Sequence, residues 1–263
     1  MIYVSDIGTF LYCKRLFFLR KIHKLKVQKT QQITFGDIFH HANELLYTFE
    51  PKFLINYDMH DFNALLNIYK TLKRFVIKKS MLRFKHDISR LNLDPMNLIN
   101  ELDQYLNTEI MIRSREVFNY SKENQLLAYD LVQNLFPKVI TEFRIKDPSL
   151  DLIGRIDRLL IYPTHQVPVE FKTSSRIYDS HIYQASAYGV MLKHSGIKVN
   201  YVKILLSNFD EKIIYLNPFH EIELRKLLNE MKYILDNKIL PQKTTNKNKC
   251  QSCPLKDVCD NLD

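Results

Sequence analysis

Two short apolar segments near the middle of the chain constrain the fold most. Residues 152–161 and 167–171 are rich in aliphatic side chains, several of them β-branched, and a Pro-Thr-His sequence at 163–165 separates them. Such segments on either side of a turn-forming cluster predict a hairpin of two core strands. Any charged residue inside these strands needs a specific partner, because burying an unpaired charge is costly.

Three charged residues lie inside the predicted hairpin: Asp157 in the first strand, and Glu170 and Lys172 in the second. Glu170 and Lys172 are two residues apart and therefore project from one face of their strand. Mg²⁺ and Mn²⁺ prefer carboxylate oxygens, to which the carbonyl of Phe171 could add another, and a lysine could stabilise charge on a phosphate. The pattern predicts a metal site beside a cation. Taken singly, Glu170–Lys172 or Asp157–Arg158 could also be an ordinary surface charge pair.

The length and composition limit the class of protein. The chain has 263 residues, of which 46% are hydrophobic, enough for one large domain or a core with an inserted lobe. We find no apolar run long enough to cross a bilayer and no leader peptide, so we expect a cytoplasmic protein that does not associate with membranes. Glycine-rich loops of the Walker or dinucleotide-binding type are absent.

The periodicity of apolar residues predicts helices at both ends of the chain and strands after the middle. We expect one helix over residues 5–22, capped by Ser5 or Asp6, and a second helix that starts near Gly36 and Asp37. The remaining expected elements are a mostly helical stretch over 51–136, a strand over 139–145, the hairpin, a helix over 178–194, strands over 199–207 and 212–216, and a helix over 218–237.

The net charge of +9 is concentrated in two clusters, at residues 13–29 and 70–90. Clustered lysine and arginine suit a polyanion, most plausibly nucleic acid, although a solvated basic face is an equally good explanation of either cluster alone. From the first cluster we expect DNA contacts by Lys14, Arg15, Arg20 and Lys21. The aromatic residues Phe17, Phe18, Phe75 and Phe84 could stack on bases, but most of them are expected in the core.

The four cysteines are distributed as one near the start and three near the end. They are Cys13, Cys250, Cys253 and Cys259, and the last three have C-x2-C-x5-C spacing. In a cytosolic protein, clustered thiolates favour a metal over disulfides, and four of them complete either a zinc site or a [4Fe–4S] cluster. The spacing does not distinguish a zinc site from a [4Fe–4S] cluster, and free or redox-active cysteines are a further alternative. Either metal site would join the first helix to the tail.

Several short motifs occur in a characteristic order: Gly36-x3-His40, Gly154-Arg-Ile-Asp157, Glu170-Phe-Lys172 and Gln184-x3-Tyr188. This order resembles the RecB-like branch of the PD-(D/E)XK nucleases. The cysteine layout is similar to the iron–sulfur members of that branch, which include AddB-type recombination proteins and stand-alone CRISPR-associated exonucleases. The length of the chain is most similar to that of the stand-alone type.

The resemblance implies a restriction-endonuclease-like α/β fold, with a central mixed β-sheet flanked by helices. The nuclease core would comprise residues 1–48 and 138–263, with an iron–sulfur-stapled C-terminal tail. The resemblance does not extend to residues 49–137, which we expect to form a helical insertion lobe; the charge and position of this lobe suggest that it could roof the active site. The implied site residues share a role in binding or processing DNA. His40, Asp157 and Glu170, with the Phe171 carbonyl, would bind Mg²⁺ or Mn²⁺; Lys172 and Gln184 would be catalytic; Tyr188 would orient the DNA; and Cys13, Cys250, Cys253 and Cys259 would hold a [4Fe–4S] cluster.

The sequence departs from the family pattern at three positions. His41 follows His40 directly, so the ligand could be shifted by one residue, although the spacing from Gly36 favours His40. Lys14 stands where the family often has proline. Glu142 lies where such nucleases often carry an upstream acid, and a structural, DNA-positioning or catalytic role is open for it.

The resulting hypothesis is a metal-dependent DNA exonuclease that acts on single strands or DNA ends. By resemblance it would serve CRISPR spacer acquisition and antiviral defence, with an integrase as a candidate partner. The alternatives are a DNA-end-binding or processing subunit of a recombination-repair complex, and a viral or mobile-element nuclease for genome processing.

Overall fold

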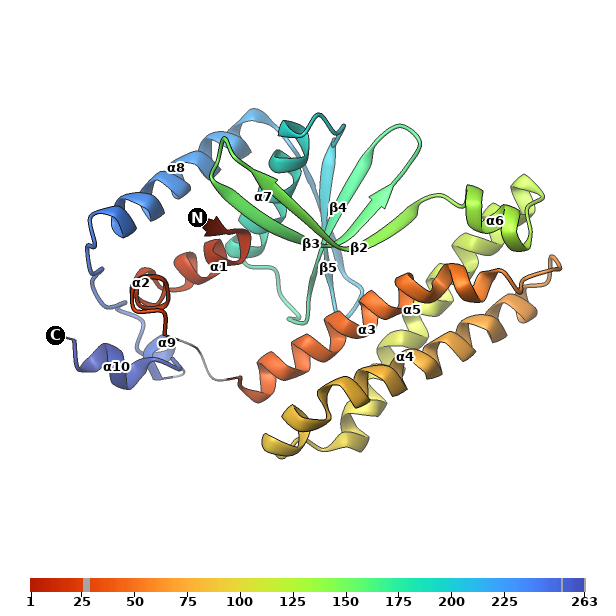
Figure 1. The fold of residues 1–263 in the computed structure, drawn as a ribbon, viewed down its shortest axis with the longest axis horizontal. Helices are drawn as coiled ribbons and strands as arrows, with labels where there is room; N and C mark the ends of the chain where they lie inside the picture. The colour runs from red at the N-terminus through yellow and green to blue at the C-terminus, as the bar shows by residue number, and fades with distance from the viewer. Residues whose placement is uncertain (26–28, 252, 263) are drawn as a thin grey trace.

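The computed structural model describes residues 1–25, 29–251 and 253–262. Within these residues six strands form one mixed sheet in the order β1-β3-β4-β5-β6, and β2 pairs with β3 (Figure 1). The strands are β1 (Ile2–Tyr3), β2 (Lys138–Asp147), β3 (Leu152–Ile161), β4 (Gln166–Lys172), β5 (Tyr201–Leu206) and β6 (Glu211–Tyr215). The helices are α1 (Val4–Tyr12), α2 (Lys14–Ile22), α3 (Gln31–Leu54), α4 (Phe62–Arg90), α5 (Pro95–Asn124), α6 (Ala128–Asn134), α7 (Asp179–His194), α8 (Pro218–Asp236), α9 (Lys247–Gln251) and α10 (Lys256–Asp260).

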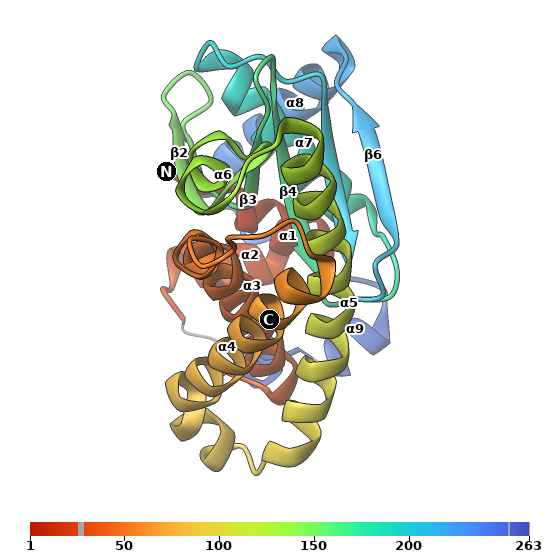
Figure 2. The ribbon, with the colours of Figure 1, turned by 90° about the vertical axis from the view of Figure 1, so that its right-hand side faces the viewer.

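Helices cover both faces of the sheet and create two hydrophobic cores (Figures 1 and 2). The first core lies between the sheet and helices α1, α2, α7 and α8, with Ile7, Ile156 and Met191 fully buried. The second core lies among α3, α4, α5 and α6, and Phe171 of β4 reaches into it. The predicted α/β fold with a helix-flanked mixed sheet is therefore confirmed.

The helical lobe is joined to the sheet by a buried polar network rather than by a flexible linker. Helix α3 is 24 residues long and continues through the predicted lobe boundary at residues 48 and 49. Arg158 of β3 donates hydrogen bonds to Glu109 Oε1 (2.8 Å) and to the Tyr47 hydroxyl (3.1 Å). Nearby, Arg113 of α5 makes a bidentate contact with Glu50 of α3 at 2.8 and 3.0 Å. The strand that carries Asp157 is thus bonded directly to the lobe.

Two expectations about the N-terminal helices are wrong in detail. The single helix over 5–22 is interrupted at Cys13, whose backbone is extended (φ −161°, ψ 114°), so α1 and α2 are separate helices. The second helix begins five residues earlier than Gly36, because the Thr30 side chain accepts a hydrogen bond from the Ile33 amide and caps it. Gly36 therefore lies within α3, not at its start.

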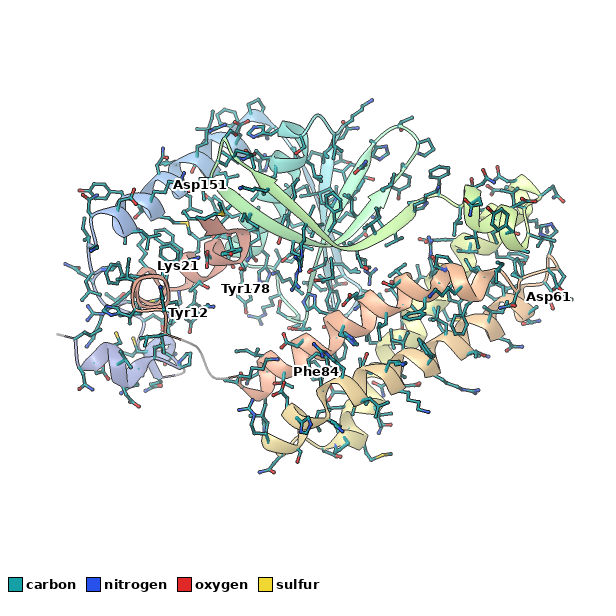
Figure 3. The ribbon with its side chains drawn as sticks, in the orientation of Figure 1. Tyr12, Lys21, Asp61, Phe84, Asp151 and Tyr178 are labelled. Carbon is teal, nitrogen blue, oxygen red and sulfur yellow. The ribbon has the colours of Figure 1, made fainter. Side chains whose placement is uncertain are left out.

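The phenylalanines considered for base stacking are mainly core residues. Phe17 and Phe18 are 1% and 4% exposed, so the first of the basic clusters presents neither ring to solvent. On α4, Phe75 packs against Phe49, and Phe84 packs edge-on against His41 (Figure 3). Phe17 and Phe18 therefore belong to the core, as expected for most of these rings.

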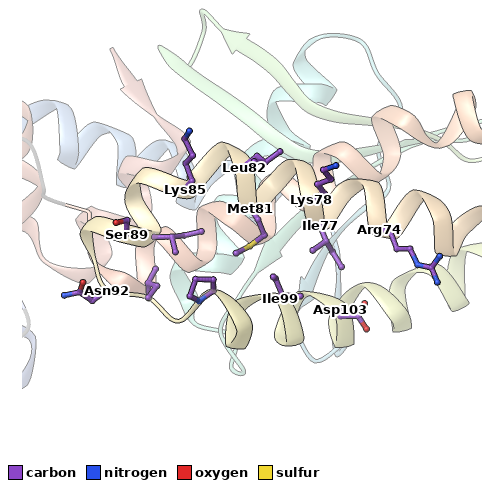
Figure 4. Close-up of a pocket in the computed structure, with 13 residues that line it drawn as sticks. Arg74, Ile77, Lys78, Met81, Leu82, Lys85, Ser89, Asn92, Ile99 and Asp103 are labelled. Atoms are coloured by element: carbon purple, nitrogen blue, oxygen red, sulfur yellow. The ribbon is translucent and has the colours of Figure 1, made fainter.

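The second basic cluster lies on α4, beside a groove of about 920 Å³ between α4 and α5. Ile77, Met81 and Ile99 point into this groove, and Lys78 and Lys85 also contribute to its lining (Figure 4). The described lining is aliphatic and polar without an aromatic ring, so this groove offers no surface for base stacking. In the part of the chain that the structure describes, no helix has both the length and the apolarity to cross a membrane.

Candidate active site

Asp157 occupies a fork between two strands. Strands β3 and β4 pair only from Arg158 to Ile161 on one side and from Gln166 to Val169 on the other. Beyond this point they separate, and the Asp157 carboxylate accepts a 2.8 Å hydrogen bond from the amide of Phe171. The side chain therefore takes the place of a missing strand contact and fixes the carboxylate at the end of the hairpin.

An irregularity in the sheet brings a second carboxylate to the same point. Glu142 of β2 has a positive φ of 54°, a conformation that is uncommon outside glycine. It lies opposite Asp157, between the paired positions Thr141–Arg158 and Phe143–Ile156. Because such backbone strain concentrates at functional sites, it marks Glu142 as a candidate site residue.

His40 of α3 completes a cluster with these two acids. His40, Glu142 and Asp157 each offer one ligand atom, and these atoms lie within 4.8 Å of one another. His40 Nδ1 is 3.5 Å from Asp157 Oδ1. Burial disfavours the charged form of His40, but the adjacent Asp157 carboxylate outweighs this and raises the pKa of His40. Carboxylates and an imidazole at such spacing suit Mn²⁺ or a similar divalent cation.

Glu170 and Lys172 project from one face of β4, as the sequence predicts. Lys172 Nζ donates to Glu170 Oε1 at 2.6 Å and to Gln184 Oε1 at 2.9 Å. The second oxygen of Glu170 is buried and has no hydrogen-bond partner among the described residues. Burial raises the pKa of Glu170 to about 7, against the lowering effect of Lys172. A buried carboxylate oxygen in this state fits a cation as its missing partner.

Helices α1 and α7 pack closely against each other where Gln184 of α7 reaches the site. A Cβ added to Gly8 of α1 would lie 2.9 Å from Gln184 Nε2, so glycine allows Gln184 to reach Lys172. The Tyr188 hydroxyl donates to the carbonyl oxygen of Arg155 at 2.8 Å, and its ring packs against Gly154. Tyr188 therefore supports β3, and a DNA contact by its hydroxyl would compete with this bond.

Part of the predicted site lines one cavity of about 580 Å³, whose described lining does not include His40 or Phe171. Its lining includes Asp157, Glu170, Lys172, Gln184 and Tyr188, together with residues of α1, β2 and β3. None of the described lining residues comes from 49–137. Phe171, which follows Glu170 on β4, belongs to the hydrophobic core of the helical lobe.

The basic residues of α2 expected to contact DNA are engaged within the protein. Lys21 pairs with Asp6 at 2.5 Å (Figure 3), Lys14 pairs with Glu230, and Arg20 donates to the Thr9 hydroxyl at 3.1 Å. Arg15 is only 4% exposed. It donates to the carbonyl oxygens of Pro241 (3.2 Å) and Cys259 (3.3 Å) and so attaches the tail to α2.

The four cysteines meet at one end of the molecule, although Cys13 is far from the others in sequence. All four line a single pocket between the α1–α2 break and the tail helices α9 and α10. They are half-buried and form no disulfide in the described part of the chain. Burial, with the neighbouring thiols, raises the pKa of Cys253, so its thiolate would need a cation beside it. The donor set therefore fits a metal centre.

Comparison with known proteins gives a family match. The model of the PD-(D/E)XK nuclease superfamily matches residues 4–260. A protein from Eubacterium rectale described as a candidate exonuclease is 11% identical, with a TM-score of 0.49, over 100% of this chain and 88% of its own. The protein SSO0001 is 15% identical, with a TM-score of 0.34, over 96% of each chain. No curated protein matches the sequence. Because the family model spans nearly the whole sequence, the chain belongs to the PD-(D/E)XK nuclease superfamily.

Proposed function

We propose that this protein is a metal-dependent deoxyribonuclease that hydrolyses phosphodiester bonds as an exonuclease on single strands or DNA ends. The observation that carries the proposal is the buried, unpartnered Oε2 of Glu170 beside the cluster of His40, Glu142 and Asp157. Oε1 of Glu170 accepts from Lys172, whereas Oε2 has no hydrogen-bond partner among the described residues, and a divalent metal would supply one. The carbonyl of Phe171 remains a further predicted ligand.

The residues around the metal site have complementary roles. A bound Mg²⁺ or Mn²⁺ would supply Lewis acidity towards the scissile phosphate and a more acidic water. Lys172 would neutralise charge that develops on the phosphate, since its ammonium group is fixed between Glu170 and Gln184. Gln184 would orient Lys172, and Asp157 would remain ionised, because the His40 charge and the amide of Phe171 outweigh burial and lower its pKa.

Replacing Lys172 with methionine tests this role directly. We expect loss of Mn²⁺-dependent cleavage of a single-stranded oligonucleotide by about 10²-fold or more, as for other transition-state charge stabilisers. Glu170→Gln should weaken both metal binding and cleavage. Lys203→Met is a matched control, because Lys203 lies on β5 of the same sheet and pairs with Glu211 outside the cavity. Normal cleavage by both site variants would refute the assignment.

We also propose that Cys13, Cys250, Cys253 and Cys259 hold a [4Fe–4S] cluster. All four cysteines line one pocket, and four thiolates suit either zinc or an iron–sulfur cluster. The resemblance of the cysteine layout to iron–sulfur nucleases favours the cluster. The purified protein should be brown and contain about four irons per chain. A colourless protein with one zinc would favour the alternative.

A biological role in CRISPR spacer acquisition, with an integrase as partner, is a further proposal that rests on the resemblance of the motifs. Co-purification with an integrase and trimming of DNA ends before integration would support it. The competing role is a DNA-end-binding subunit of a recombination-repair or viral genome-processing complex. Negligible turnover by the isolated protein, combined with tight binding of DNA ends, would favour that role instead.

A further inference from the structure

Strands β2 and β3 carry two arginines directly opposite one another. Arg144 and Arg155 are register partners in the antiparallel ladder, and both are exposed. Like charges in directly opposed positions destabilise a strand pair. Arg144 has no ion pair or side-chain hydrogen bond among the described residues, whereas Arg155 pairs with Glu142, so in the described part of the chain only Arg155 has an acidic partner that offsets this repulsion. The pair is therefore unfavourable for the sheet by itself.

Both arginines line the active-site cavity. They share its wall with Asp157, Glu170 and Lys172. Arg155 is two residues before Asp157 on β3, which places the two residues about 6–7 Å apart along the strand. A backbone phosphate adjacent to one bound at the metal-ligand cluster would therefore lie within reach of these guanidinium groups.

The orientation of Arg155 is fixed by an acid of the site. Its Nε lies 2.7 Å from Glu142 Oε2, and its side chain is still 64% exposed. This contact uses one edge of the guanidinium group and leaves the Nη groups for a ligand. Glu142 thus holds Arg155 at the opening of the cavity and is also part of the cluster with His40 and Asp157.

We propose that Arg144 and Arg155 form a phosphate-binding site that holds the DNA backbone next to the scissile bond. This inference rests on the proposed nuclease function. A pair of guanidinium groups suits the phosphodiester, because each can donate two parallel hydrogen bonds to phosphate oxygens. Contacts to phosphate alone carry no base sequence, so the site would bind single strands irrespective of sequence. The sequence analysis expects contacts with DNA from the basic residues of α2, whereas the proposed phosphate site lies on β2 and β3.

Equilibrium binding in EDTA tests the site without cleavage. The probe is a fluorescein-labelled single-stranded oligonucleotide, titrated with wild type, Arg144→Gln, Arg155→Gln and the double variant over a range of salt concentrations. We expect each single variant to bind about tenfold more weakly, the value of one lost charge-assisted hydrogen bond, and the double variant to bind about 10²-fold more weakly. Each lost phosphate contact should also reduce the log–log salt slope by about 0.7. Arg144→Gln is the cleanest change, because it breaks no bond within the described protein.

Arg225→Gln provides the matched control, since Arg225 is an exposed arginine of α8 that pairs with Glu221 outside the cavity. It should bind DNA like wild type. A dissociation constant and salt slope unchanged in the double variant would overturn the proposal. Failure of the wild type to cleave DNA with Mg²⁺ or Mn²⁺ would instead refute the nuclease function, while the binding titration would still decide the phosphate site.

Discussion

Replacing Glu109 with glutamine tests how firmly the helical lobe is attached to the strand that bears Asp157. Arg158 and Glu109 are 7% and 6% exposed, with Nη1 and Oε1 2.8 Å apart. The glutamine keeps the shape of the side chain but leaves the charge of Arg158 buried without a counterion. Breaking a buried pair in this way costs about 3–5 kcal/mol. We take about 3 kcal/mol, because the Tyr47 hydroxyl still accepts from Arg158. For a chain of this size the melting temperature should fall by roughly 6–12 °C.

A double-mutant cycle separates this coupling from the loss of packing. Glu109→Gln, Arg158→Met and the double variant would be unfolded in urea and followed by circular dichroism. Removing both charges should cost less than the sum of the single changes, with a coupling energy of about 1–3 kcal/mol. The more exposed Lys203–Glu211 pair is the control and should give a coupling below about 1 kcal/mol. Additive effects of Glu109→Gln and Arg158→Met would show that the pair does not attach the lobe.

Three further predictions follow from single sites. Hydrogen bonds of the Asp147 carboxylate outweigh burial and lower its pKa, so Asp147→Asn should cost about 1–3 kcal/mol of unfolding free energy at pH 7. The difference in unfolding free energy between wild type and Asp147→Asn should shrink as the pH falls below about 4, because protonation of Asp147 then removes its contribution from the wild type as well. A difference that is independent of pH would contradict this. Gly8→Ala should displace Gln184 and lower kcat by about two- to tenfold without altering the melting temperature. Gly36→Ala is the control and should leave kcat unchanged, because its added Cβ would meet its nearest neighbour only at 3.8 Å. Because burial raises the pKa of Glu170 to about 7, Mn²⁺ affinity measured by calorimetry should fall between pH 8 and pH 6, and equal affinities would contradict this.

Local patterns in the sequence predicted the parts of the fold that depend on near neighbours. The helix expected at 178–194 is α7, and the helix expected at 218–237 is α8, each within one residue at its ends. The hairpin of β3 and β4 was also predicted, because β-branched segments around a turn favour strand pairing regardless of the rest of the chain. The spacing of Glu170 and Lys172 placed both on one face, since the side chains of a strand alternate.

The three-dimensional structure alone decided which charges face the substrate cavity. Arg15 has the sequence context of a DNA-binding residue, but the tail folds back over it and it binds the carbonyl of Cys259. Glu142 lies close to His40 and Asp157, at the point where β2 becomes irregular opposite Asp157. Arg144 and Arg155 come together through the register of two strands. Composition and periodicity report which residues can be buried, whereas contacts between distant segments depend on register and packing, and these determine which charges remain available to bind DNA.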